Sequence, residues 1–261
     1  MAAVRTEVDD MSYTVGIPRE VRRVVSLVPS LTDAVAATAP ELLIGATTWC
    51  THPPGLEVER LRGTKNPNVR RIVELAPDLV VLNKEENRKL DHERLVAAGI
   101  PVWVTVVEDV DTALRSLERL FALALGVPEP DWLVTARREL GGAPPEPVAR
   151  AVICVWRDPW MVVGRDNFTT DLLRRLGVEN IFAGHEGRYP HMSLDEIRAA
   201  NPDLVVLPDE PYEFGPDDGP EEFGAAARLV NGRSLTWYGP SLTDARQVLS
   251  RQLWPIEERC R

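Results

Sequence analysis

The feature that most constrains the fold of this chain is a hexapeptide that occurs twice. Pro-Asp-Leu-Val-Val-Leu stands at residues 77–82 and recurs letter for letter at 202–207. Each copy follows a short amphipathic run, at 71–75 and 195–200, which is typical of a helix that stops at a proline. The apolar residues after the aspartate then predict a buried strand. A helix-strand unit repeated half a chain apart predicts two lobes of similar build, with a ligand cleft between them.

The rest of the chain alternates in the same way, which is typical of parallel βα units. We therefore predict an α/β protein with two similar Rossmann-like lobes, each on a parallel sheet, joined by a helical linker. The expected strands are 23–28, 42–47, 79–82, 102–106, 151–156, 180–184, 204–207 and 235–237, with a returning hairpin strand at 160–164. The expected helices start at Ser30, Val69, Asp91, Asp111 or Thr112, Asp131, Thr169, Leu194 and Pro240.

The clearest break in composition is the Gly-Gly-Ala-Pro-Pro-Glu-Pro run at 141–147. We place the lobe boundary in the helix and linker around residues 128–148. We predict an N-terminal lobe over residues 1–127, a linking helix with its Pro/Gly-rich linker over 128–148, and a C-terminal lobe over 149–261.

Composition excludes several classes of protein. The chain has 261 residues, 44% hydrophobic and 27% charged, which is typical of a globular protein. A net charge of -10 argues against nucleic-acid binding and against anionic membrane surfaces. No apolar run approaches the ~20 residues that span a bilayer, so membrane insertion is not expected. The cysteines at 50, 154 and 260 form no CxxC pair; Cys154 is predicted to be a core residue and Cys260 to be inert.

The first ten residues bear on the cellular location of the protein. Residues 1–10 hold no apolar stretch of the kind found in export signals, and Glu7, Asp9 and Asp10 are unfavourable there. This predicts a cytoplasmic protein. The alternative is a periplasmic or cell-surface protein from which a leader has been removed.

Several segments carry a resemblance to a known family. The segments are Arg23–Thr32 (RVVSLVPSLT), Cys50–Pro54 (CTHPP), Gly63–Asn68 (GTKNPN), Ile72–Leu82, Gly164–Phe182 and Tyr189–Ser193 (YPHMS). In these segments the chain resembles the class III periplasmic substrate-binding proteins, the helical-backbone metal receptors that bind cobalamin, haem and iron-siderophores for ABC importers. The resemblance spans residues 13–250 and is strongest to the cobalamin-binding branch.

The resemblance also implies a mode of docking on a membrane permease. Importer proteins of this family present an acidic residue on each lobe to arginines of the permease. Asp195 stands at the second-lobe position, but Arg70 stands at the first. Arginine facing arginine would be repulsive, so permease docking is disfavoured for this chain.

Candidate ligand contacts follow from the topology. In parallel α/β lobes the ligand lies at the carboxyl ends of the strands. Four of the seven tryptophans fall in those loops, and indoles bury bulky flat ligands well; alternatively, one or two of them fill the interface between the lobes. The predicted ligand-binding residues are Ser30, Trp49, Cys50, His52, Lys65, Asn66, Lys84, Trp156, Arg157, Trp160, Arg165, Arg188, Tyr189, Trp237 and Tyr238.

The basic members of this set predict an anionic ligand. Lys65, Arg157, Arg165 and Arg188 could hold carboxylates or phosphates, such as corrin side chains or haem propionates. The alternative for each is an ordinary solvated surface residue.

Cys50 and His52 are candidates for metal binding. A thiolate and an imidazole two residues apart suit a soft metal, or an axial position of haem or cobalamin, with His191 as a further ligand. Alternatively, His52 only hydrogen-bonds the Pro53-Pro54 turn and Cys50 is a spectator.

The function predicted from the residues and the resemblance is binding of a small molecule. The chain lacks GxSxG, P-loop, GxGxxG and HExxH motifs, so catalysis is not favoured. We predict a binding protein for a bulky metal-containing cofactor or chelate, cobalamin-like first, then haem or a ferric siderophore. The alternatives are a metal- or haem-dependent enzyme of specialised metabolism on the same fold, and a conventional ABC importer substrate-binding protein without its leader.

Overall fold

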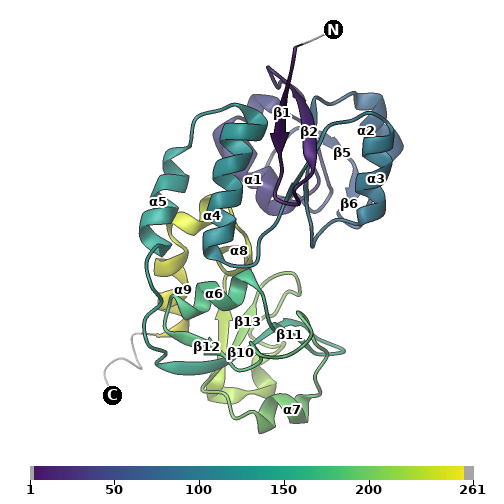
Figure 1. Cartoon of the computed structure of the whole chain (residues 1–261). Coiled ribbons are helices and arrows are strands. Elements are labelled where there is room, and N and C mark those ends of the chain that lie inside the picture. Colours follow the sequence, from purple (N-terminus) through teal and green to yellow (C-terminus); the bar gives the residue numbers. More distant parts are fainter. Residues whose placement is uncertain (1–2, 256–261) are drawn as a thin grey trace. The chain divides into compact units, whose positions relative to one another are not determined.

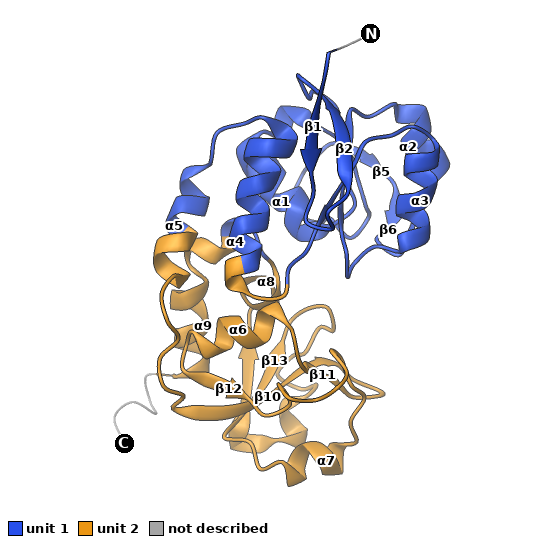
Figure 2. Cartoon of the chain, in the orientation of Figure 1, with its two compact units in different colours: residues 1–107, 112–135, 238–240 blue, residues 108–111, 136–237, 241–261 orange. Residues whose placement is uncertain are grey.

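The computed structural model describes residues 3–255 (Figure 1). It divides into two compact units (Figure 2): unit 1 holds residues 1–107, 112–135 and 238–240, and unit 2 holds 108–111, 136–237 and 241–261. The chain passes between the units at several places. One lies within α5 (Asp131–Leu140), inside the segment predicted as the linker, and another lies between Trp237 and Tyr238.

Unit 1 is built on a parallel sheet in the order β5-β4-β3-β8-β9. The first hexapeptide copy forms the inner strand β8, all of whose residues are buried. Strand β3 pairs with β8 in the register Val24 with Leu79 and Ser26 with Val81. The strands are β3 (Val24–Ser26), β4 (Leu43–Ala46), β5 (Glu59–Arg60), β8 (Leu79–Asn83) and β9 (Val102–Thr105), with a small antiparallel pair β6 (Arg62–Gly63) and β7 (Asn66–Pro67).

The helices that follow these strands differ from the predictions mainly at their starts. Helix α1 begins at Pro29, whose fixed φ suits a first helical position, so the expected start at Ser30 was one residue late. Asp91, expected as a cap, lies inside its helix and is buried. The helices are α1 (Pro29–Thr38), η1 (Pro40–Leu42), α2 (Val69–Leu75), α3 (Lys89–Ala97), α4 (Val110–Arg119) and the π-helical η2 (Leu120–Leu125), which ends at Gly126.

The chain opens with an antiparallel hairpin that the sequence analysis missed. Strand β1 (Val4–Val8) pairs with β2 (Thr14–Pro18). Asp9 closes the turn, since its Oδ1 accepts hydrogen bonds from the amides of Met11 and Tyr13 at 2.9 Å. Its Oδ2 accepts from the Val104 amide at 3.0 Å and so ties the hairpin to β9. Asp9, which is unfavourable in an export signal, therefore has a structural role here.

Unit 2 repeats the plan of unit 1. Its sheet has the order β11-β10-β13-β14, with β12 beside β10. The second hexapeptide copy forms β13, again buried throughout. The predicted hairpin is confirmed, because β11 runs antiparallel to β10. The strands are β10 (Ala149–Trp156), β11 (Met161–Val162), β12 (Val178–Asn180), β13 (Leu204–Pro208) and β14 (Ala227–Val230).

The helices of unit 2 lie mostly where expected. A capping box begins α7: Ser193 Oγ accepts from the Glu196 amide, and Glu196 accepts from the Ser193 amide. The helices are α6 (Phe168–Arg174), α7 (Leu194–Ala199), η3 (Pro220–Glu222), η4 (Gly224–Ala226), α8 (Gly232–Thr236), η5 (Pro240–Thr243) and α9 (Ala245–Leu253).

The expected strand at 235–237 was wrong. Leu235 and Thr236 belong to helix α8, and the last strand is β14, which pairs in parallel with β13. The reason is a helix cap: Asn231 Oδ1 accepts a hydrogen bond from the Ser234 amide at 2.8 Å. A similar side-chain bond ends β12 early, since Asn180 Oδ1 accepts from the Phe182 amide where the strand was expected to continue.

Two further expectations are confirmed. The α/β class, with parallel sheets in two similarly built units, is as predicted. Cys154 is fully buried in the core of unit 2, where burial raises the pKa of its thiol. Cys260 lies outside the described residues. Across residues 3–255, no helix combines the length and the apolar character needed to cross a membrane.

Candidate ligand-binding site

The predicted ligand-binding residues are divided between the units, and most lie in loops at the carboxyl ends of the parallel strands. Because side chains at one sheet edge share one surface, each unit presents its own candidate face. Unit 1 holds Ser30, Trp49, Cys50, His52, Lys65, Asn66, Lys84 and Tyr238, and unit 2 holds Trp156, Arg157, Trp160, Arg165, Arg188, Tyr189, His191 and Trp237.

Trp49 is the most prominent residue of the unit 1 face. It follows β4, and 67% of its surface is exposed. Its indole lies over the backbone at Gly63: a Cβ there would come 3.2 Å from Trp49 Nε1 and 2.5 Å from Asn66 Oδ1. Glycine at this position therefore lets Trp49 and Asn66 lie close together, and both were predicted to bind the ligand.

Cys50 lies beneath this face. It is fully buried, and its Sγ lies 3.1 Å from the hydroxyls of both Thr32 and Thr47. Burial raises the pKa of the Cys50 thiol, which favours its protonated form, whereas a metal ligand must be a thiolate. Neighbouring His52 is partly exposed, with Nδ1 3.2 Å from Thr51 Oγ1. Within residues 3–255, no group of three or more His, Cys, Asp or Glu side chains is placed to hold a metal ion.

Glu86 also lies at the unit 1 face, where it makes a hydrogen bond to a residue distant in the chain. The Tyr238 hydroxyl donates to Glu86 Oε1 at 2.7 Å, and Lys65 Nζ donates to the Glu85 carbonyl at 2.5 Å nearby. Burial raises the pKa of Glu86 to about 7. The sequence analysis named Lys84 from this loop and missed Glu86. The available signal was a pair of glutamates directly after a buried strand.

In unit 2, two tryptophans of one loop have different environments. Trp156 ends β10 and is 43% exposed. Trp160 is only 8% exposed and packs in the core, with its ring stacked on Phe214 at 5.8 Å and edge-to-face with Phe223 at 5.3 Å. Of these two, Trp156 offers a surface for a ligand.

Arg157 is engaged by an acidic loop of its own unit. Its guanidinium pairs with Asp218, with Glu221 at 2.5 Å and with Glu222 at 3.4 Å. It also lies 5.4 Å over the Trp160 ring, and only 17% of the side chain is exposed. These partners already neutralise the charge that was predicted to bind an anionic ligand.

The other basic candidates of unit 2 lie on two segments that touch at Gly164. The Gly164 amide donates to the Arg188 carbonyl at 2.7 Å, and a Cβ at Gly164 would overlap the Gly187 carbonyl. Arg165 is exposed and pairs with Asp166 at 3.6 Å, while Arg188 pairs with Glu108 at 3.7 Å. Beyond them, exposed Tyr189 and His191 follow, and His191 forms a backbone bridge with Met161.

Glu210 is the counterpart of Glu86 in unit 2. It follows β13, and burial raises the pKa of its carboxyl. Arg233 and the Trp237 side chain oppose this rise, and the Arg233 guanidinium lies 5.8 Å over the Trp237 ring. Trp237 and Tyr238 are both buried, so they support this surface rather than projecting from it.

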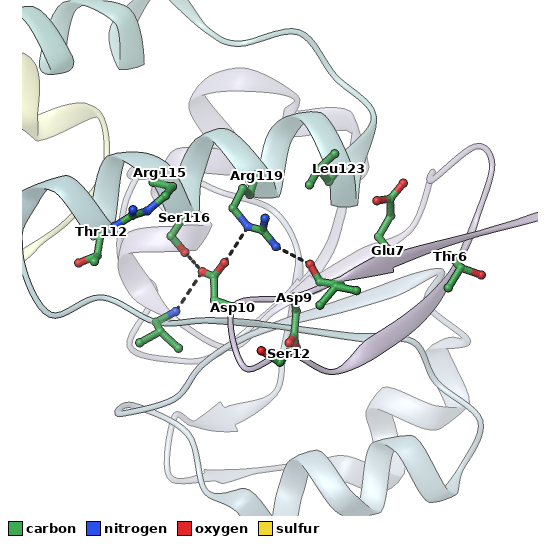
Figure 3. A pocket seen from close by; sticks show the side chains of 12 residues that line it. Thr6, Glu7, Asp9, Asp10, Ser12, Thr112, Arg115, Ser116, Arg119 and Leu123 are labelled. Atoms are coloured by element: carbon green, nitrogen blue, oxygen red, sulfur yellow. Dashed lines mark hydrogen bonds and ion pairs between the residues drawn. The ribbon is translucent and has the colours of Figure 1, made fainter.

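A separate hollow of about 650 Å³ lies between β1 and α4 in unit 1 (Figure 3). Some of its polar side chains bind one another: Arg119 donates to Asp10 at 3.0 Å and to the Val8 carbonyl, and Ser116 also donates to Asp10. These bonds hold the hairpin against α4. The predicted ligand-binding residues lie elsewhere in the described chain.

Comparisons with known proteins show which proteins the chain is similar to. No protein-family model matches it. It is 24% identical over 243 residues to a vitamin B12-binding protein of Pectobacterium carotovorum, an alignment that covers 89% of this chain and 88% of that protein. It is 28% identical over 197 residues to the vitamin B12-binding protein of Salmonella paratyphi A, covering 71% of each.

Solved structures share the fold over nearly the whole chain. The periplasmic vitamin B12-binding protein BtuF of Vibrio cholerae matches with a TM-score of 0.72 and 20% identity, covering 89% of this chain and 96% of that one. CeuE of Helicobacter pylori matches with a TM-score of 0.78 and 14% identity, covering 97% and 89%. The periplasmic haem-binding protein RhuT of Roseiflexus sp. RS-1 matches with a TM-score of 0.69 and 20% identity, covering 89% and 99%. In sequence and in fold, the chain is similar to binding proteins of the class that its motifs indicated.

Proposed function

We propose that this chain is a binding protein for a bulky metal-containing ring cofactor, with cobalamin as the first candidate. The observation that carries the proposal is the pair of exposed indoles, Trp49 in unit 1 and Trp156 in unit 2, each at the carboxyl end of a parallel strand. Large aromatic side chains exposed at such an edge are typical of ligand contact. The vitamin B12-binding relatives give cobalamin its precedence.

Haem is the second candidate. Several structures with this fold are haem-binding proteins. The observation that favours haem here is the set of cations at the unit faces, since Lys65 and exposed Arg165 could pair with propionates. His52, which is partly exposed, could supply an axial ligand.

The proposed place of action is the periplasm. The structural relatives described as periplasmic favour this alternative over the cytoplasmic location predicted from the first ten residues. Docking on a permease stays disfavoured by Arg70, which is 88% exposed and pairs with Glu74 at 2.9 Å. Asp195 lies exposed in the first turn of α7, as a docking carboxylate would.

The test is a spectral titration of the purified chain. Cyanocobalamin, haemin and a ferric siderophore are added separately, and absorbance and melting temperature are followed. We expect saturable binding of cyanocobalamin with a rise in melting temperature, because a ligand that binds only the folded state stabilises it. A Soret shift with haemin alone would move the assignment to haem. If none of the three binds, the proposal is wrong.

A further inference from the structure

Two neighbouring aromatic residues each lie near a half-buried glutamate of their own unit. Tyr238 hydrogen-bonds to Glu86 within unit 1, and Trp237 interacts with the Glu210 carboxyl within unit 2. The chain passes from unit 2 to unit 1 at the peptide bond between these aromatic residues. On the unit 1 side, the crossing segment is therefore fixed by the carboxyl group of Glu86.

The two carboxyl groups occupy similar positions in the internal repeat. Glu86 lies four residues after Leu82, the end of the first hexapeptide, and Glu210 lies three residues after Leu207, the end of the second. Both follow a buried parallel strand, at the sheet edge that carries the candidate ligand contacts. The repeat therefore places a half-buried glutamate near each end of the crossing.

Burial has the largest effect on the pKa of both glutamates, and neighbouring groups modify it. Glu86 is faced by Tyr238, by Lys65 and by its neighbour Glu85, and the Cys50 thiol senses its charge. Burial and Glu85 favour the neutral form, while Tyr238 and Lys65 favour the carboxylate. Glu210 is faced by Asp209, which opposes ionisation, and by Arg233 and Trp237, which favour it.

A carboxylate accepts a hydrogen bond about twice as strong as the bond that a neutral carboxyl accepts. Tyr238 is therefore held more firmly when Glu86 is ionised. We propose that Glu86 is a positioning residue whose ionisation fixes Tyr238, and through it the ligand face of unit 1. The effect on ligand affinity rests on the proposed function, whereas the titration of Glu86 does not.

The titration of Glu86 is tested on the protein without ligand. Carboxyl ¹³C resonances of glutamate and the Tyr238 Cζ resonance are followed by NMR from pH 5 to 9. We expect Glu86 to titrate near pH 7 and Tyr238 to report the same midpoint. Tyr238→Phe should raise the Glu86 midpoint, because a donor to the carboxylate is lost, and Glu85→Gln should lower it, because a like charge is lost.

The proposal is overturned if Tyr238 reports no titration in this range, or if its titration persists in Glu86→Gln. Should Glu86→Gln fail to fold, the opposite shifts expected for Tyr238→Phe and Glu85→Gln still decide the outcome. For the ligand, cyanocobalamin affinity should be about threefold higher at pH 8 than at pH 6, and Glu86→Gln should remove that difference. A protein that titrates as described but binds no cyanocobalamin would contradict the proposed function. It would not contradict the role of Glu86 in fixing Tyr238.

Discussion

The hydroxyl of Tyr238 donates a 2.7 Å hydrogen bond to the carboxyl of Glu86, although 152 positions separate the two residues in the chain. This bond brings the segment 238–240 back to the unit formed mainly by residues 1–107 and 112–135. It links the folding of unit 1 to the binding of a proton, because the pKa of Glu86 is raised in the folded chain.

The stability of the protein should therefore depend on the ionisation of Glu86. Its pKa lies near 7 in the folded chain and at the ordinary value of 4.5 when unfolded. The folded state binds the extra proton, so the stabilisation is complete below pH 4.5 and is lost as the pH rises through 7. Urea unfolding from pH 4 to 8 should show this loss, about 3 kcal/mol at most, relative to Glu86→Gln. Parallel pH profiles for the two proteins would refute it.

Arg157 should hold the acidic loop of unit 2. Arg157→Ala leaves Asp218, Glu221 and Glu222 as neighbouring carboxylates without their shared cation. We expect the melting temperature to fall by about 3–5 °C and limited proteolysis to begin within 209–222. The control is Arg165→Ala, because Arg165 is exposed and is paired with Asp166 at the long distance of 3.6 Å. Equal effects of the two variants would show that the loop does not depend on Arg157.

Gly164 should be intolerant of a side chain. A Cβ there would overlap the Gly187 carbonyl and come 3.2 Å from the Arg188 carbonyl. Gly164→Ala should therefore lower the free energy of unfolding by about 2–4 kcal/mol, measured in urea. At Gly184 a Cβ would meet nothing within 4 Å among the described residues, so Gly184→Ala serves as the control. A Gly164→Ala protein as stable as the control would contradict the packing described.

Cys50 should be unreactive in the native protein. It is fully buried between Thr32 and Thr47, and burial keeps its thiol protonated. The native wild type and Cys50→Ser should release equal amounts of thionitrobenzoate from Ellman's reagent, and they should differ by one equivalent only in 6 M guanidinium. An extra fast equivalent in the native wild type would indicate an accessible thiolate, and would revive Cys50 as a metal ligand.

Much of the fold could be predicted because its signals are local. Strands β8 and β13 are continuous apolar runs that follow a proline and an aspartate, and nothing distant is needed to read them. The missed hairpin and the misread segment 235–237 were also local: Asp9 closes one turn, and Asn231 caps one helix. Their side-chain bonds to backbone amides outweighed the β-propensity of Leu-Thr-Trp.

The site was less predictable, because contacts with residues distant in the chain decide which of its side chains are exposed and which are already paired. Trp156 and Trp160 lie in one loop, yet Trp160 is buried because Phe214 and Phe223 stack against it from another segment. From the sequence, Arg157 is a candidate cation for a ligand, but in the structure it pairs with acidic residues within 218–222. Glu86 gains its role only from Tyr238. Pattern reasoning finds the strand ends, but tertiary contacts decide which side chains remain available there.

The most direct test of the proposed function is the affinity for cyanocobalamin of wild type and of the double variant Trp49→Ala, Trp156→Ala. Both indoles are exposed, so their removal should leave the melting temperature nearly unchanged. Each indole lost from a ligand contact costs about 1–2 kcal/mol, so we expect affinity to fall by at least about tenfold. Tyr13→Ala, which removes an exposed aromatic ring on the β1–β2 hairpin, is the control. Wild-type affinity in the double variant, or no binding in the wild type, would contradict the account.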